Sequence, residues 1–222
     1  SAESHGGIVG AGNGSVSNCT SSVTFIDSDG LTTCSKYGGI VGYATGGTIS
    51  NCLAVGVTIP AVLKMGAIVA VNAGGTLTAN YYLNCTVGGN TTNVGNGSVD
   101  PNGARSVHSL TLADGVTASG ESVTIGTDTY YASNTNVTFT YNGSIPRGYV
   151  LDIKVKDAND NDIAVTYSND TYTFKMPACD ATVSGITDVW GIASDADGSE
   201  AHPYIITTPA GLDLLAKMVN GR

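Results

Sequence analysis

The chain has few charged residues and little proline for its length. Lys, Arg, Asp and Glu make up 12% of its 222 residues, about half of the usual globular share, and there are six prolines. This composition excludes a coiled coil and a charged disordered tail. Only nine residues are Lys or Arg and the formal net charge is −9, so the chain lacks the basic surface that binds a phosphate backbone. We therefore expect no nucleic-acid partner.

Cysteines in metal-binding spacing and long apolar runs are also missing. The five cysteines are an odd number without a C-x-x-C spacing, which predicts neither a closed disulfide framework nor a zinc site. The longest apolar run, Gly66-Ala-Ile-Val-Ala-Val71, is much shorter than the roughly 18 to 20 residues of a membrane span. There is no initiator methionine or signal peptide, so we expect a segment of a longer protein.

Glycine is abundant, with thirty residues, and much of it belongs to an internal repeat. Each unit has an apolar dipeptide between small residues, and an alternating segment follows eight or nine residues later. The dipeptide segments are Gly6-Gly-Ile-Val-Gly10, Gly38-Gly-Ile-Val-Gly42 and Gly66-Ala-Ile-Val-Ala70, and the alternating segments are 14–19, 47–52 and 75–80. The periods are 32 and 28 residues.

The alternating segments are typical of half-buried strands. Val16, Ile49 and Leu77 occupy one face, and Ser or Thr residues occupy the other. One unit alone cannot bury its apolar face, but units stacked about 4.8 Å apart form a continuous apolar ladder. We expect the Gly-Gly pairs to supply positive φ angles at tight corners. The pattern predicts a short β-solenoid over residues 1–90.

Cys19 and Cys52 hold the same place in consecutive units and should therefore be neighbours in the stack. Two interpretations follow from this placement. The pair could form a disulfide, or both side chains could be small apolar fillers of the core. Adjacent rungs seldom present good disulfide geometry, which favours fillers.

These units resemble the GLUG-type repeats of bacterial surface proteins, in which Gly-Gly-Ile-Val-Gly is followed by Gly-Thr-Ile-x-Asn-Cys. The unit that begins at Gly38 matches this pattern closely, and the unit that begins at Gly6 matches nearly as well. The third unit departs at Ala67, Ala70 and Ala79, a departure that a terminal rung would tolerate. The resemblance covers about residues 1–90.

A second β domain is predicted over residues 105–186, after a linker of Gly, Asn, Thr and Ser over 91–104. Turn sequences separate its strand-like runs, so we expect hairpin connections and an antiparallel β-sandwich-like domain. The predicted strands are 107–112, 121–125, 137–141, 151–155, 163–167, 171–174 and 181–184, and the predicted turns are 113–116, 142–143, 157–162 and 168–170.

The end of this domain and the tail carry further signals. Tyr172–Val183 is similar to the Phe-x-Met-Pro-Ala-x-Asp-x-Thr-Val close of small repeat domains in bacterial extracellular proteins, which implies a spacer or presentation module. Residues 187–222 are expected to begin a further module with one C-terminal helix. Thr208 is the predicted N-cap and Pro209 the first helical residue, with an apolar face at Leu212, Leu215, Ala216 and Val219. By the GLUG resemblance, such a helix caps an open first rung.

No catalytic or cofactor constellation is evident. The histidines His5, His108 and His202 lie far apart, and no glycine-rich stretch has a phosphate-loop pattern. Two oxygen-rich clusters are calcium candidates, through Asp157, Asn159 and Asn161 and through Asp195 and Asp197. The first lacks the glycine and the distal glutamate of an EF-hand loop and lies between predicted strands, so a hairpin turn is the preferred interpretation.

Two tyrosine pairs are candidate ligand contacts. Tyr81-Tyr82 and Tyr130-Tyr131 could form a platform for sugar rings, although such residues more often cover the end of a small core. The sequence thus predicts an all-β chain: a short β-solenoid, an antiparallel β-sandwich-like domain and one C-terminal helix.

The family resemblance implies a function. It points to a non-enzymatic fragment of an adhesin-like protein at the bacterial cell surface, which acts as a rigid structural and adhesive repeat module. A carbohydrate-binding module of a surface glycan-utilisation system is the alternative. The expected partners are a host or microbial surface glycan or protein and neighbouring repeat modules, including head-to-tail self-association.

Overall fold

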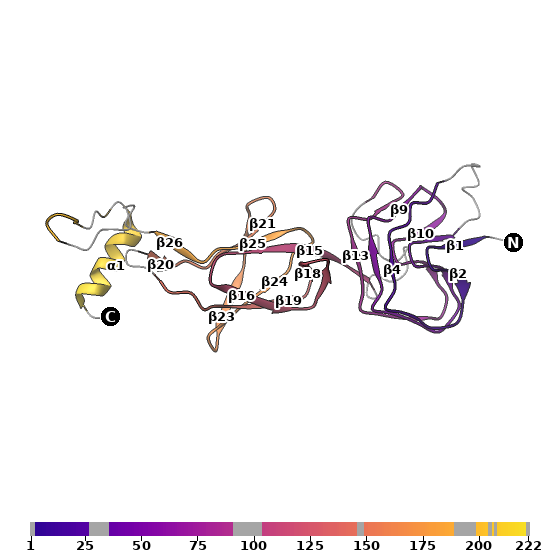
Figure 1. Ribbon diagram of the computed structural model, residues 1–222, viewed down its shortest axis with the longest axis horizontal. Helices are drawn as coiled ribbons and strands as arrows, with labels where there is room; N and C mark the ends of the chain where they lie inside the picture. Colours follow the sequence, from indigo (N-terminus) through magenta and orange to yellow (C-terminus); the bar gives the residue numbers. More distant parts are fainter. Residues whose placement is uncertain are drawn as a thin grey trace. The chain divides into compact units, whose positions relative to one another are not determined.

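The computed structural model describes residues 3–26, 36–90, 104–145, 149–188, 199–203, 206 and 208–220. The chain is almost entirely β-structure, with parallel three-stranded sheets, antiparallel sheets and one helix (Figure 1). Two compact units are present. Unit 1 contains Ser1–Ser109, Glu121–Thr135 and Met176–Cys179, and unit 2 contains Leu110–Gly120, Asn136–Lys175 and Asp180–Arg222.

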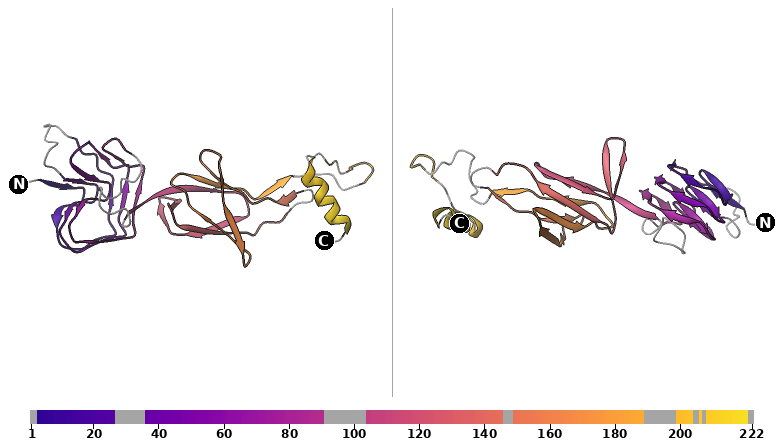
Figure 2. Two further views of the ribbon diagram at one scale, coloured as in Figure 1. Left: turned by 180° about the vertical axis from the view of Figure 1, so that it is seen from behind. Right: turned by 90° about the horizontal axis from the view of Figure 1, so that it is seen from below.

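Unit 1 is built around a β-solenoid of three coils, which we call coil 1 (4–26), coil 2 (36–59) and coil 3 (64–87). Equivalent strands of the coils pair in parallel, and the stacked layers are visible in Figure 2. The sheets are β1 (Ser4–Gly6), β5 (Lys36–Gly38) and β10 (Lys64–Gly66); β2 (Val9–Gly12), β6 (Val41–Ala44) and β11 (Val69–Asn72); β3 (Val16–Ser17), β7 (Thr48–Ser50) and β12 (Thr76–Thr78); β4 (Thr20–Ser21), β8 (Leu53–Val55) and β13 (Asn80–Leu83); and β9 (Thr58–Ile59) with β14 (Thr86–Val87).

The register confirms the predicted repeat. Ser4 pairs with Lys36 and Lys36 with Lys64, so the coils repeat after 32 and then 28 residues. Val16, Ile49 and Leu77 pair in one column. Their side chains pack in or against a core that also holds the fully buried Ile40 and Ile68 of the dipeptide segments. Stacking therefore buries the apolar face that a single coil would expose.

The Gly-Gly pairs have a different role from the one predicted. None of Gly6, Gly7, Gly38 and Gly39 has a positive φ. They are glycines because the backbones of the chain approach closely: a Cβ on Gly7 would lie 2.2 Å from the Gly39 carbonyl oxygen, and a Cβ on Gly39 would lie 2.0 Å from the Ala67 carbonyl oxygen. The column Gly7, Gly39, Ala67 thus carries a methyl group only in coil 3.

One column of positive φ angles occurs instead at other corners of the coils. Asn18, Asn51 and Ala79 have φ angles of 54°, 52° and 52°. Asparagine tolerates this left-handed conformation well, whereas alanine does not. The next residue in coil 3, Asn80, is buried, accepts a hydrogen bond from Cys52 N (3.0 Å) and donates one to Ile49 O (2.8 Å). Its side chain therefore ties coil 3 to coil 2.

One long strand contributes to both units. The first residues of β15 (Ala104–Leu112) pair in parallel with β13, as a further strand of the solenoid sheet. Its middle residues pair with β18 (Asp128–Ala132), which forms a hairpin with β17 (Ser122–Ile125) in unit 1. Its last residues pair with β25 (Ala181–Val183) in unit 2. The predicted linker lies outside the described residues, except for Ala104 at the start of β15.

Unit 2 contains two β-layers (Figure 1). One is a four-stranded antiparallel sheet, and the other combines the end of β15 with three shorter strands. Both contribute buried residues, including Phe139 and Phe174 from the first layer and Val155 and Val183 from the second. The first layer has the order β16 (Val116–Gly120), β19 (Asn136–Tyr141), β24 (Thr171–Lys175), β23 (Val165–Ser168), and the second contains β25, β21 (Val155–Asp157) and β22 (Asp162–Ile163). A separate antiparallel pair joins β20 (Tyr149–Leu151) to β26 (Ile186–Asp188).

The predicted hairpin connectivity is only partly correct. The turns at 157–162 and 168–170 do join paired strands. Residues 142–143 do not, because β19 pairs with β16 and β24 rather than with β20. The pair β15 and β25 is parallel and distant in sequence. The predicted strand 151–155 is not continuous. There the backbone bonds to a side chain instead of a strand: Ser184 Oγ accepts a hydrogen bond from Lys154 N and donates one to Asp152 O.

The C-terminal helix α1 (Pro209–Asn220) begins as predicted. Thr208 Oγ1 accepts a hydrogen bond from Gly211 N at 3.0 Å, the geometry of an N-cap. On the predicted apolar face, Leu212 is 59% exposed, Ala216 is exposed and Leu215 is half-buried. No helix among the described residues has the length and apolar character of a membrane span.

Candidate functional site

The two predicted tyrosine pairs lie in unit 1, on β13 and β18. Tyr82 and Tyr131 are buried, with 5% and 7% exposure, and burial raises the pKa of Tyr131. Tyr81 and Tyr130 are half-buried and pack against the cluster of Leu83, Val107 and Ala132. The four rings therefore do not form one exposed platform: Tyr81 and Tyr130 cover a small core, and Tyr82 belongs to the solenoid core.

The hydroxyl group of Tyr81 is already engaged. It donates a hydrogen bond to Glu121 Oε1 at 3.1 Å, and Arg105 Nη1 lies 3.0 Å from Glu121 Oε2. Burial, followed by the neighbouring Glu121 carboxylate, raises the pKa of Tyr81 to about 12. This arrangement fastens the β17–β18 hairpin to β13 and β15.

The first calcium candidate, which contains Asp157, Asn159 and Asn161, forms the hairpin turn that the sequence favoured, between β21 and β22. Asp157 Oδ1 accepts hydrogen bonds from the backbone N–H groups of Asn159 (2.8 Å) and Asn161 (2.9 Å), and Asp157 Oδ2 accepts one from Asn161 Nδ2 (3.0 Å). These bonds, those from Asn161 above all, hold the pKa of Asp157 below its usual value. Lys156 pairs with Asp160 at 2.8 Å. Both carboxylate oxygens of Asp157 therefore already accept hydrogen bonds within the turn.

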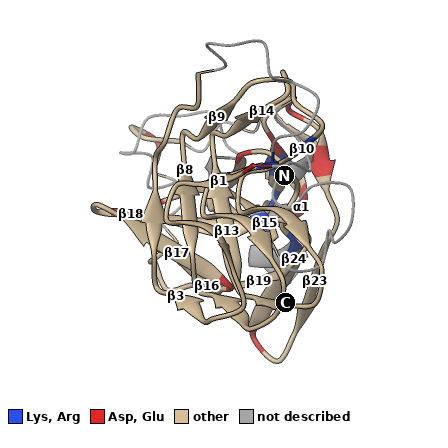
Figure 3. Ribbon diagram, turned by 90° about the vertical axis from the view of Figure 1, so that its right-hand side faces the viewer, with Lys and Arg blue, Asp and Glu red and all other residues tan. Residues whose placement is uncertain are grey.

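The second calcium candidate, Asp195 and Asp197, lies outside the described residues. Within the part of the chain that the structure describes, no three His, Cys, Asp or Glu side chains gather as metal ligands would. Charged residues are sparse along the ribbon, as Figure 3 shows.

Cys19, Cys52 and Cys85, the solenoid cysteines among the described residues, are free thiols. Cys19 and Cys52 are not bonded to each other, so they fill the core between coils. Cys52 Sγ donates to Ser50 O at 3.3 Å, and Cys85 Sγ donates to Ala54 O at 3.4 Å. Burial raises the pKa of both Cys52 and Cys85, which keeps them protonated and unreactive.

The structure brings together a serine–histidine cluster that the sequence did not reveal. His108 Nε2 lies 2.9 Å from Ser106 Oγ, and Ser106 Oγ donates to the buried Ser133 Oγ at 2.8 Å. Whether His108 Nε2 donates to Ser106 or accepts from it is set by the tautomer of the imidazole ring. The spacing Ser106-x-His108 on one strand face was the available signal.

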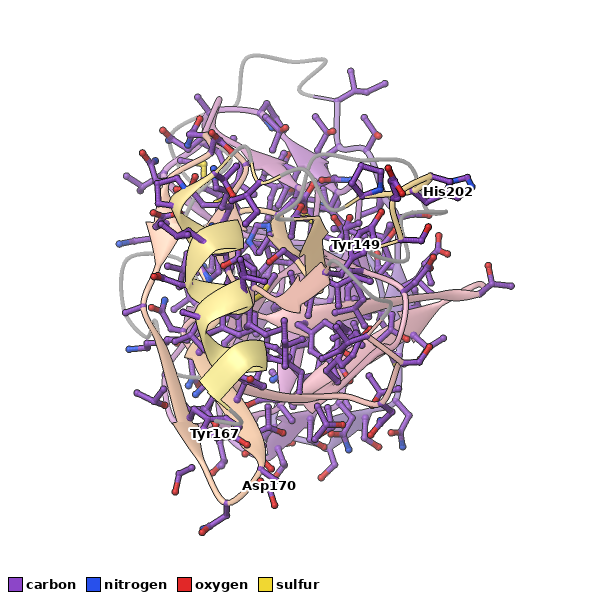
Figure 4. The ribbon with its side chains drawn as sticks, turned by 90° about the vertical axis from the view of Figure 1, so that its left-hand side faces the viewer. Tyr149, Tyr167, Asp170 and His202 are labelled. Carbon is purple, nitrogen blue, oxygen red and sulfur yellow. The ribbon has the colours of Figure 1, made fainter. Side chains whose placement is uncertain are left out.

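A second group that sequence reasoning missed is a row of aromatic rings in unit 2. Phe139, Tyr172 and Tyr167 are aligned across β19, β24 and β23 by the strand register. Ring centroids are 5.2 Å apart between Phe139 and Tyr172 and 4.6 Å apart between Tyr172 and Tyr167. Tyr167 is 59% exposed, and its hydroxyl donates to Asp170 Oδ1 at 2.9 Å (Figure 4). In the sequence, the short turn between Tyr167 and Tyr172 was the feature that could have indicated that these two rings face each other on paired strands.

Comparisons with protein-family models, with curated proteins and with solved structures found no match to this chain.

Proposed function

We propose that this chain is a non-enzymatic module of an adhesin-like protein at the bacterial cell surface, where it acts as a rigid structural and adhesive repeat. The coil-on-coil register of unit 1 carries this proposal. Each coil bonds the next through several separate parallel sheets, so the backbone is fixed at many points along a short length. The sequence resemblance to GLUG-type repeats supports the same conclusion.

The polar groups fit a structural role. The hydroxyl of Tyr81, the carboxylate of Asp157 and the Ser106 hydroxyl are each committed to a partner within the fold. We propose that the module uses no cofactor and no metal. Its partners are a surface glycan or protein and neighbouring repeat modules. The uncovered Leu212 of α1 is a contact point for such a module or for a second copy in head-to-tail association.

Adhesion of protein-coated beads tests the proposal. Beads that carry the chain should bind mucin, glycan or extracellular-protein surfaces saturably, with and without a calcium chelator, while beads that carry heat-denatured chain should not. Turnover of any glycan or peptide on these surfaces, or the absence of binding to all of them, would contradict a non-enzymatic adhesive module.

A carbohydrate-binding module of a glycan-utilisation system is the second candidate. The exposed ring of Tyr167 favours it, because an uncovered aromatic face at a sheet edge suits a sugar ring. Binding to soluble polysaccharides without adhesion to cell-derived surfaces would favour this function over an adhesin.

A further inference from the structure

The aromatic row of unit 2 runs from the core of the sheet to its edge. Phe139 is 1% exposed, Tyr172 is half-buried and Tyr167 is 59% exposed. Among the described strands, β23 is the last of its sheet, so no further strand continues the row beyond Tyr167. The stack of rings therefore ends with one aromatic face open to solvent.

The exposed ring is held in a defined position. On one side it packs against Tyr172, with an angle of 40° between the ring planes. At its far end the hydroxyl is bonded to Asp170, and this bond raises the pKa of Tyr167. Asn169 and Asp170 both have positive φ angles, of 50° and 58°, as the central residues of a tight hairpin turn of type I′ do. A ring fixed in this way loses little conformational entropy when a ligand covers it.

The chemistry around the ring selects the ligand. A pyranose ring has C–H groups on its faces, which pack on an aromatic face, and hydroxyl groups around its rim. Asp170 places carboxylate oxygens at the edge of Tyr167, where they can accept hydrogen bonds from such hydroxyls. This carboxylate and the net charge of −9 repel anionic ligands, including uronic and sialic acids. The site therefore favours neutral hexoses.

We propose that the hairpin of β23 and β24 binds neutral glycans, with Tyr167 as the stacking surface for one pyranose ring and Asp170 as the acceptor for its hydroxyl groups. This proposal deepens the adhesive function proposed above and rests on it, since it names the class of ligand. It moves the glycan contact away from the tyrosine pairs of unit 1, whose rings cover a core.

Affinity electrophoresis and a glycan array, both with the full chain, test the site. The probes are neutral gluco-, manno- and galacto-oligosaccharides together with matched uronic acid oligomers. We expect binding to at least one neutral series and none to the acidic oligomers. Tyr167→Ala should weaken binding by about tenfold or more, as loss of a central aromatic contact does.

Three further variants sharpen the test. Tyr167→Phe keeps the ring but loses the bond to Asp170, so its affinity should fall less than that of Tyr167→Ala. Asp170→Ala should also weaken binding. Tyr43→Ala, which removes a partly exposed tyrosine of the solenoid, should leave affinity unchanged. Circular dichroism melts establish that each variant is folded, and a variant that is unfolded is replaced by Tyr167→Leu.

The outcomes separate the site from the general function. Glycan binding that is equal in wild type and Tyr167→Ala overturns the site and leaves the adhesive function standing. Adhesion to protein surfaces without binding to any glycan also overturns the glycan site and leaves the adhesive function standing. Preference for the acidic oligomers also overturns the site, as does a concentration-dependent dimer that Tyr167→Ala abolishes. Absence of both adhesion and glycan binding overturns both proposals.

Discussion

Substitution of Gly39 by alanine should open the solenoid between coils 2 and 3. The added Cβ would lie 2.0 Å from the Ala67 carbonyl oxygen and 3.0 Å from its carbon, whereas ordinary Cβ contacts begin at 3.4 Å. Both obstructing atoms belong to backbone, and the neighbouring Gly39 N and Ile40 N bond to Gly66 O and Ile68 O. The clash therefore cannot be relieved by a side-chain rotation, and coil 3 must move.

The expected loss of stability follows from two opposing effects. Overpacking of a well-packed interior costs about 1–3 kcal/mol, and a clash with backbone belongs at the upper end of this range. Alanine lowers the conformational entropy of the unfolded chain relative to glycine, and this effect stabilises the fold by about 0.4–1 kcal/mol. The free energy of unfolding of unit 1 should therefore fall by about 2 kcal/mol, which corresponds to a roughly 30-fold larger population of opened molecules.

Thiol labelling measures this change where it occurs. Cys52 is 0% and Cys85 is 1% exposed, so a thiol reagent modifies them only when the coils open. Their labelling should be about 30-fold faster in Gly39→Ala than in wild type. Gly14→Ala is the matched control, because a Cβ there meets no atom within 4 Å, and it should label at the wild-type rate or more slowly. Equal rates in Gly39→Ala and wild type would refute the close-approach explanation of the glycines.

Three other predictions concern coil 3 and its neighbours. Ala79→Asn should raise the free energy of unfolding in urea by about 0.5–1 kcal/mol, because asparagine suits the φ of 52°, and a loss of stability would contradict this. Asn80→Ala should lower it by about 2–4 kcal/mol, since Cys52 N and Ile49 O lose their partner; a neutral effect would argue against that role. In absorbance titration Tyr81 should ionise near pH 12, and Glu121→Gln should lower this pKa. The pKa of Tyr81 is higher in the folded chain than the ordinary 10.0, so protonated Tyr81 stabilises the fold fully below pH 10, and this stabilisation is lost as the pH rises toward 12. Tyr81→Phe should therefore reduce the fall in the free energy of unfolding between pH 10 and pH 12.

The elements that the sequence predicts correctly are those whose signals are local or repeated. The coils are predictable because equivalent apolar residues such as Val16 and Ile49 recur at a fixed period. The helix is predictable because Thr208 and Pro209 are adjacent cap signals. The turn at 157–162 is predictable because the Asp157 side chain can accept hydrogen bonds from backbone N–H groups that follow it closely in the chain, here those of Asn159 and Asn161.

Other elements depend on partners that are distant in sequence. Strand β16 has small and polar residues, and its strand conformation is set by pairing with β19. Strand β18 also begins with polar residues, and its strand conformation depends on pairing with β15 and β17, so the sequence pattern does not predict it. The parallel pairing of Leu110 with Ala181 has no local signal at all. The aromatic row needs the register of three strands, and the role of Gly39 needs the position of the next coil.

The glycine column also restricts how such a solenoid can lengthen through gene duplication. Each of Gly7 and Gly39 faces the carbonyl oxygen of the coil that follows it, and Ala67 holds the same place in coil 3. A duplicated coil 2 could be inserted ahead of coil 3, because its glycine leaves room for a successor. A duplicated coil 3 placed before another coil would direct the Ala67 methyl group at that coil's backbone. A new coil is therefore accommodated more easily upstream of the coil with alanine than after it.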